Sequence, residues 1–417
     1  MTTNITGRTK QQTFILILIL GILNTITPFS IDMYLPAFPQ IAKDLRTTLG
    51  DVSLSVSTYF LGFALGQIIY GPLLDRFGRK PPLYIGLSLY VIASIVCALS
   101  QTIDALLIAR FFQAISGCVA TVAAMAMVRD FFPPDKGSSI ISFLVLILGL
   151  SPLLAPTTGS LVMSVLSWRW IFIVLASIAL IMLFVTIFFL QEGHKADKSI
   201  SLKPKPIITG FANILTEKRF YIFSLAGTFS FAGLFVYVAG SPSIFMDEFN
   251  VSVKAYGGIF ALLSVGFIGG SQMNHLLSRK FMNDQIFKTV LIIQVVASIS
   301  YFIGVYYIGL GLIAHLIFLF ITLSCAGLTY PNAAAIALSP FSKNAGSASA
   351  LLGFIQIGIG GSISSGIGLL HTKGSFSTAL IMAITSSVAL IILLAGRVRI
   401  TDEMREEIKL AAKTEVM

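Results

Sequence analysis

The sequence predicts an all-α membrane protein in which twelve transmembrane helices form two bundles of six. Three observations lead to this fold class. First, 56% of the 417 residues are hydrophobic and only 11% are charged, whereas soluble domains carry about 25% charged residues. Second, twelve apolar runs reach the roughly 20 residues that a helix needs to cross a bilayer. Third, the longest polar interruption leaves six runs on each side, as an internal repeat in a transporter would.

Each run is continuously apolar and lacks the alternation of a membrane β-barrel, so helices are expected. We expect them near 13–35, 52–74, 81–100, 104–128, 138–164, 169–190, 219–245, 254–277, 286–309, 311–336, 347–370 and 376–397. The resulting division is an N-terminal bundle over 1–190, a cytoplasmic linker over 191–218, a C-terminal bundle over 219–400 and a cytoplasmic tail over 401–417. The linker stretch "IITGFANIL" is a candidate surface helix, and the tail a candidate solvated helix.

The distribution of basic residues predicts the orientation of the spans. With the N-terminus in the cytoplasm, cytoplasmic segments hold 22 of the 28 Lys and Arg residues and outer segments hold five. The remaining one, Arg110, lies inside a span. This asymmetry predicts cytoplasmic N- and C-termini, and it explains the net charge of +10 without a nucleic-acid partner.

Several classes of function are excluded by what the sequence lacks. The three cysteines, Cys97, Cys118 and Cys325, are scattered through apolar runs, which argues against a disulfide framework and a metal cluster. No Walker-type Lys-Ser/Thr pair follows a glycine run, so a nucleotide loop is not expected. With no soluble domain or catalytic triad, the sequence predicts neither an enzyme nor a bound cofactor.

Two charged residues fall inside the predicted spans, away from the ends of the helices. Asp32 is the only one of 18 acidic residues so placed, and Arg110 is the only base. Such residues are costly in hydrocarbon and usually face a protein interior or a watery cavity. From the helical rise, both lie roughly 6–9 Å below the outer boundary, so they could share one cavity. Asp32 is either a proton-binding carboxylate or a structural or interfacial acid, and Pro28 is expected to bend the helix just below it.

The stretch "GPLLDRFGRKP", at 71–81, follows the second predicted helix. It resembles the loop signature of the Major Facilitator Superfamily, G-x-L-x-D-R-x-G-R-K. The fixed positions are Gly71, Leu73, Asp75, Arg76, Gly78, Arg79 and Lys80. The corresponding join in the second half keeps only Arg279 and Lys280. This resemblance implies that the first half carries proton coupling.

Other stretches narrow the resemblance. "LIARFFQAISG" (107–117) is similar to the family's helix 4 motif and carries Arg110 and Gln113. "SPLLAPTTGSLV" (151–162) resembles the helix 5 antiporter motif and keeps Pro156 and Gly159, although Ala155 and Ser160 stand where that motif prefers glycine. "DMYLPAFPQI", "RDFFPP", "YPNAAAIALSPF" and "AGSASALLGFIQ" resemble the bicyclomycin and chloramphenicol resistance (Bcr/CflA) branch of drug:proton antiporters.

The resemblance implies alternating access between two bundles, with a cytoplasmic lock. Asp75 is expected to bind the N–H groups near Gly346 and Ser347, and Arg79 to pair with Asp130. Asp32 and Arg110 are the expected proton-coupling residues. The family's cavity-lining helices supply these substrate-binding candidates: Asn24, Tyr34, Tyr59, Gln113, Phe143, Phe231, Phe235, Tyr237, Asn332 and Gln356. For most of the aromatic candidates, ordinary helix packing is an equally good interpretation.

The function that the resemblance implies is proton-coupled export of small amphipathic molecules such as antibiotics, by a monomer in the bacterial inner membrane. Its partners would be a small-molecule substrate, protons and the lipid bilayer. Export of a self-made metabolite such as a siderophore, proton-coupled nutrient uptake, and a receptor or scaffold without transport remain alternatives. The sequence does not name the substrate.

Overall fold

The computed structural model describes residues 10–132, 134–193, 196–197, 204–341, 345–370, 372 and 374–396, which form helices and turns without a strand. All twelve predicted runs are long helices in this part of the chain. The N-terminal six are α1 (Lys10–Asp32), α3 (Leu49–Phe77), α4 (Lys80–Leu99), α5 (Ile103–Phe131), α6 (Pro134–Val165) and α7 (Arg169–Phe189). The C-terminal six are α9 (Lys218–Pro242), α10 (Val253–Leu277), α11 (Asn283–Ile303), α12 (Leu312–Leu338), α13 (Ala345–Ser364) and α15 (Gly374–Gly396).

The length and apolar composition of these helices confirm an all-helical membrane fold. Eleven spans in the described residues are long and apolar enough to cross a membrane, and the described part of α6 adds a shorter apolar stretch, Leu150–Val165. The short helices are η1 (Leu35–Ala37), α2 (Phe38–Asp44), α8 (Pro204–Leu215), η2 (Ser243–Glu248), η3 (Gly304–Ile308) and α14 (Gly366–Leu369). The expected linker helix is therefore confirmed as α8, whereas the tail over 401–417 lies outside the described residues.

The helix boundaries follow from local chemistry. The Thr48 hydroxyl accepts from the Asp51 N–H while the Asp51 carboxylate accepts from the Thr48 N–H, a capping box that begins α3. At the starts of α5 and α10 only one such bond forms: the Thr102 hydroxyl accepts from the Ala105 N–H, and the Ser252 hydroxyl accepts from the Ala255 N–H. Gly78 ends α3 at a φ of 86°, a conformation that favours glycine. Helix α1 ends at Asp32 and not at 35, because the chain turns there into η1.

Apolar side chains form one core inside each bundle and a third core between them. Leu20 and Val119 belong to the N-terminal core, and Leu291 and Ile336 to the C-terminal core. The third core joins residues of both halves, including Phe60 of α3 and Phe235 of α9. Burial of this third core stabilises the contact between the bundles.

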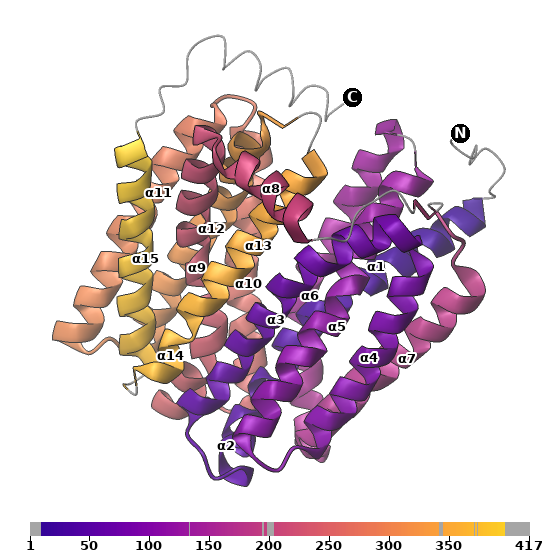
Figure 1. Cartoon of the computed structure of the whole chain (residues 1–417). Helices are drawn as coiled ribbons and strands as arrows, with labels where there is room; N and C mark the ends of the chain where they lie inside the picture. The colour runs from indigo at the N-terminus through magenta and orange to yellow at the C-terminus, as the bar shows by residue number, and fades with distance from the viewer. Residues whose placement is uncertain are drawn as a thin grey trace.

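The two bundles meet along two pairs of helices, α3 with α13 and α6 with α10 (Figure 1). The Ser57 and Ser364 hydroxyls are 2.8 Å apart across the first pair, and the Ser160 hydroxyl donates to the Val253 carbonyl at 3.0 Å across the second. A Cβ added at Gly71, further along α3, would meet no atom within 4 Å. The bundles therefore touch near α14 and separate toward the end that carries α8 (Figure 1).

Candidate functional site

The acidic residue inside the membrane lies where the two bundles meet. Asp32 is the last residue of α1 and is 6% exposed. Pro28 lies one turn before it inside the helix, where it removes the hydrogen bond to the Asn24 carbonyl. The Asp32 carboxyl is within electrostatic range of Tyr237 and Tyr256 of the C-terminal bundle. Within the described ranges, no basic side chain forms an ion pair with it.

The buried base is held inside the N-terminal bundle by aromatic rings. The Arg110 guanidinium lies 4.3 Å from the Tyr34 ring centroid and 4.2 Å from that of Tyr59, with Phe172 at 5.7 Å. Its Nη1 donates to the Gln113 side-chain oxygen at 2.6 Å. Ring faces attract a cation, most strongly when it is desolvated, so this cage stabilises the charge of Arg110 without a carboxylate.

Asp32 and Arg110 are thus divided between two different environments, and their sharing of one cavity stays a prediction. The division arises because α1 ends at Asp32 and the following turn places the Tyr34 ring over Arg110. Asp32 faces tyrosines of the other bundle, while Arg110 faces rings of its own.

Hydrogen bonds link further polar side chains around Arg110. Gln113 Nε2 donates to the Ser94 hydroxyl at 2.7 Å, and the Tyr34 and Ser55 hydroxyls are 2.5 Å apart. Three predicted substrate-binding residues, Tyr34, Tyr59 and Gln113, therefore contact Arg110 and are fully buried.

A cluster of aromatic rings crosses the boundary between the bundles. The Phe60 and Phe235 centroids are 4.5 Å apart, Phe235 and Phe231 are 5.4 Å apart, and Phe231 lies 4.9 Å from Tyr330. Tyr237, two residues beyond Phe235, stacks on Phe260 at 5.3 Å. The candidates Phe231 and Phe235 therefore share one face of α9 at the interface of the two halves, whereas Tyr237 points to another face and packs on α10.

The polar candidates differ in their surroundings. Asn24 is 1% exposed, and both polar atoms of its side chain lack a hydrogen-bond partner in the described part of the protein. Asn332 donates to Asn274 at 2.6 Å and to the Leu328 carbonyl at 2.7 Å. Gln356 is buried on α13. Phe143 belongs to α6, but its side chain lies outside the described residues.

The loop between α3 and α4 is held by a buried arginine. Arg79 is 5% exposed, and its Nε donates to Asp130 at 2.7 Å while Nη1 donates to Asp75 at 2.6 Å. Burial alone would lower the pKa of Arg79, but its hydrogen bonds to the two carboxylates outweigh that effect and raise it. The expected contact between Arg79 and Asp130 is therefore present in this conformation.

The other loop residues face outward or pack locally. The Asp75 side chain is 50% exposed and binds Arg79, and it makes no hydrogen bond to the described start of α13 in this conformation. Arg76 lies 5.8 Å from the Phe77 ring and Lys80 lies 5.6 Å from the Tyr84 ring. The expected contact of Asp75 with the start of α13 stays a prediction, because the side chains at 342–346 lie outside the described residues.

One residue of this loop site was missed by the sequence reasoning. The Glu192 carboxylate, just beyond α7, accepts from the backbone N–H groups of Arg79 and Lys80 at 2.8 and 3.0 Å. It thereby satisfies free donors at the start of α4, where negative charge is favourable. The signal was an acidic residue at the beginning of an otherwise basic linker.

The motif of α6 lies against α1 and α10. A Cβ at Gly159 would overlap the Met33 carbonyl oxygen, so glycine permits the close approach of these helices. Pro156 lies inside α6, and its carbonyl accepts from the Ser160 hydroxyl at 2.8 Å. Ser160, which departs from the family pattern, makes the contact with Val253 that joins the two bundles.

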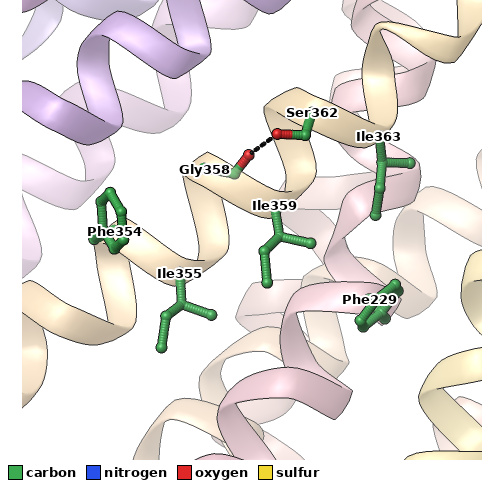
Figure 2. Close-up of a pocket in the computed structure, with 7 residues that line it drawn as sticks. All are labelled: Phe229, Phe354, Ile355, Gly358, Ile359, Ser362 and Ile363. Atoms are coloured by element: carbon green, nitrogen blue, oxygen red, sulfur yellow. Dashed lines mark hydrogen bonds between the residues drawn. The ribbon is translucent and has the colours of Figure 1, made fainter. Parts of the chain in front are cut away.

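An apolar groove of about 410 Å³ runs along α13 beside Phe229 of α9 (Figure 2). Ile359 and Ile363 point toward Phe229, and the Ser362 hydroxyl donates to the Gly358 carbonyl at 2.7 Å (Figure 2). Gly360 and Gly361 abut Phe235 and Phe60 from the other side of α13. One lining residue, Gly358, adjoins α3, because an added Cβ would lie 3.7 Å from the Ala64 side chain. The groove therefore lies beside the contact between α3 and α13, and its lining does not include Asp32 or the rings of the aromatic cluster.

No group of three or more His, Cys, Asp or Glu side chains suited to a metal ion occurs in the described residues. The chemistry of the site therefore rests on one buried carboxyl, one caged guanidinium, aromatic rings and amides. Such a set of groups can bind a proton and an amphipathic molecule.

Comparison with solved structures identifies the class of fold. The crystal structure of a D-xylose-proton symporter superimposes with a TM-score of 0.74 at 13% identity, covering 92% of this chain and 99% of that chain. This likeness shows a multi-pass membrane transporter fold.

The chain belongs to the Major Facilitator Superfamily, whose family model matches residues 20–365. A bicyclomycin resistance protein homolog of Haemophilus influenzae is 30% identical over 356 residues, which are 85% of this chain and 89% of that protein. The multidrug resistance protein MdtL of Shigella flexneri is 32% identical over 338 residues, 79% of this chain and 82% of the relative. The resemblance inferred from the motifs is confirmed.

Proposed function

We propose that this protein exports small amphipathic molecules, antibiotics among them, in exchange for protons across the bacterial inner membrane. Two relatives that align with most of the chain are named for bicyclomycin resistance and multidrug resistance. The observation that carries the proposal is the position of Asp32, a buried carboxyl at the boundary between the two bundles. Both termini lie in the cytoplasm, and the transporter works as a monomer.

Asp32 couples protons to transport because its surroundings belong to both bundles. Rocking of the bundles changes the distance between the Asp32 carboxyl and the tyrosines Tyr237 and Tyr256. Protonation alters the balance between two conformations only when the charged form is better accommodated in one of them. The caged Arg110 keeps a positive charge inside the same bundle.

The loop between α3 and α4 controls the cytoplasmic side. Arg79 and Asp130 hold the loop rigid, and Asp75 is free on its outer side to bind the start of α13 when the bundles close there. Gly71, which has open space around it in this conformation, allows that approach. Asp75 is thus the residue of the lock that makes and breaks its contact in each cycle.

The substrate binds between the bundles, against the aromatic cluster of Phe60, Phe231, Phe235 and Tyr330. Apolar surface with a few polar groups is the usual composition of a small-molecule site. Asn24 supplies an unpaired buried amide, and Tyr237 and Gln356 supply further polar groups. Because Asn24 is neutral, Asp32 is the only acid of this site, which favours neutral or singly charged substrates.

A susceptibility panel tests this proposal. Cells that lack the protein are compared with cells that express wild type or Asp32→Asn, across antibiotics and with or without a proton uncoupler. We expect wild type alone to raise the tolerated concentration of at least one compound, and the uncoupler to abolish that gain. A deletion that lowers accumulation of a compound would instead support uptake. Retention of a self-made product, without any change in drug tolerance, would support a metabolite exporter.

A further inference from the structure

A second cavity lies in the C-terminal bundle, beside the chain that follows α14. In Figure 1, α14 lies at the opposite end of this bundle from α8. Its volume is about 330 Å³, and its lining comes from the end of η2, the junction of α11 and α12, and the start of α15. The polar groups that line it include Glu248, His315 and Thr372. None of these residues belongs to the site described above, so the cavity needs its own explanation.

His315 presents a free acceptor to this cavity. It is 1% exposed, and its ring packs edge-on against Phe249 and Tyr301 with centroids 4.8 and 5.4 Å away. Its Nδ1 lies 3.1 Å from the Gly311 carbonyl, which only a protonated Nδ1 can satisfy. In the neutral ring Nε2 then carries a lone pair, and it has no partner in the described part of the chain.

Glu248 presents a carboxylate to the same cavity. One oxygen accepts from the Ser375 hydroxyl at 2.7 Å and the other from the Ser375 N–H at 3.2 Å, which fixes the group in place. Among the described residues it forms no ion pair with Lys or Arg. It is within electrostatic range of His315 and Tyr301. The cavity therefore holds fixed acceptors and negative charge.

Aromatic rings complete the lining and indicate the depth. Tyr306 and Phe376 lie in the cavity wall with their centroids 6.2 Å apart. Tyr306 is 60% exposed, and the adjoining Tyr307 is 76% exposed. Exposed tyrosines at the end of a span are typical of the boundary between the bilayer and water. Ring faces also attract cations, as the carboxylate does.

We propose that this cavity binds an organic ammonium group, with Glu248 as its counter-ion and His315 Nε2 as a hydrogen-bond acceptor. The volume suits a small molecule rather than a bare metal ion, and two ligating side chains are too few for a structural metal site. The ammonium group belongs either to a free amine or to a phosphatidylethanolamine headgroup, since the cavity opens at headgroup depth.

Isothermal titration calorimetry on the purified full chain tests the proposal with 2-phenylethylamine, and with 2-phenylethanol as its neutral counterpart. Glu248→Gln keeps an acceptor for Ser375 but removes the charge, and His315→Gln is a second variant. The matched control is Asp247→Asn, an exposed acid at the next position. We expect the Kd for the amine to rise by about tenfold or more in Glu248→Gln and to stay within about twofold in Asp247→Asn.

Nanodiscs of phosphatidylglycerol with and without phosphatidylethanolamine separate the two sources. If the headgroup is the ligand, phosphatidylethanolamine weakens amine binding by wild type but not by Glu248→Gln. If a free amine is the ligand, the lipid makes no difference. Equal binding of the alcohol, or unchanged binding in Glu248→Gln, would overturn the proposal. So would tighter binding in Lys373→Gln, because the chain's own ammonium group at 373, which lies outside the described residues, would then be the occupant.

Discussion

The two bundles share an architecture but differ in how they hold polar groups. The N-terminal bundle buries charges: Asp32, Arg110 and Arg79 are each at most 6% exposed. The C-terminal bundle uses neutral pairs at comparable depth. Ser230 donates to Gln294 at 2.6 Å and Asn332 donates to Asn274 at 2.6 Å. Neutral pairs satisfy buried groups whatever the pH, whereas a buried carboxyl changes the local charge when it binds a proton.

The joins of the two halves show the same difference. In the first half Arg79 is buried between Asp75 and Asp130, with Glu192 above the start of α4. In the second half Arg279 is exposed, and its Nη2 lies 3.1 Å from Nε2 of His275, one turn earlier in α10. We infer that the first half switches and the second half supplies a neutral partner surface. Four substitutions test this division, from the largest expected effect to the smallest.

Asp32→Asn removes the buried carboxyl at the boundary between the two bundles. We expect proton-driven export to be lost, with residual flux on the order of background, because no other buried carboxyl is available there to bind a proton. Flux is measured in proteoliposomes with an imposed pH gradient. Asp104→Asn, at an exposed helix start, serves as the control. If flux through Asp32→Asn responded to the pH gradient as wild type does, Asp32 would not be the proton-coupling residue.

The effects of Arg79→Ala and Arg279→Ala compare the loop between α3 and α4 with the loop between α10 and α11. Removing Arg79 leaves Asp130 poorly solvated, because its side chain is only 12% exposed. We expect a destabilisation of about 3 kcal/mol, the lower end for breaking a buried ion pair, since Asp75 is half exposed. Arg279→Ala should be near neutral. Thermal unfolding in detergent measures both, and equal losses would contradict the proposed asymmetry.

Gly159→Ala tests the close contact of α6 with α1. The new Cβ overlaps the Met33 carbonyl and forces the helices apart, so we expect a cost of about 1–3 kcal/mol. The control is Gly258→Ala in α10, where a Cβ meets nothing within 4 Å. The yield of folded protein and its Tm are the readouts. A Gly159→Ala protein as stable as the control would show that the helices adjust freely.

Glu192→Ala should have the smallest effect. Two backbone N–H groups at the start of α4 lose their acceptor, which costs about 1 kcal/mol. Amide hydrogen exchange at residues 79 and 80 should be faster in Glu192→Ala than in wild type. Glu192→Gln retains an acceptor oxygen, so its exchange rate should lie between those of wild type and Glu192→Ala. Glu217→Ala, at the start of α9 in the other half, is the matched comparison because its single contact with the Arg219 N–H is longer, at 3.4 Å. If exchange were unaltered in Glu192→Ala, Glu192 would not stabilise the backbone N–H groups at the start of α4.

Much of the fold was predictable because continuous apolar runs leave a membrane chain few alternatives to helices. All twelve expected helices formed, and the loop contact between Arg79 and Asp130 followed from the family motif. The sequence did not predict how Asp32 and Arg110 are oriented relative to each other. The helical rise gives the depth of each residue in the membrane, but it does not give the direction in which a side chain points from its helix. The turn after Asp32 decides that direction. Glu192 and the Glu248 cavity depend on contacts between distant segments, which no local pattern contains.

The aromatic cage around Arg110 has a consequence for the membrane voltage. Its guanidinium stays positive, so under the proposed mechanism the N-terminal half alternates between zero and one net positive charge in this region as Asp32 gains a proton. Each elementary charge carried across the potential is worth about 2.3 kcal/mol per 100 mV. An interior-negative cell would therefore draw the loaded form toward the cytoplasm and leave the empty form unaffected, so that electrical potential, and not acidity alone, would set the direction of the cycle.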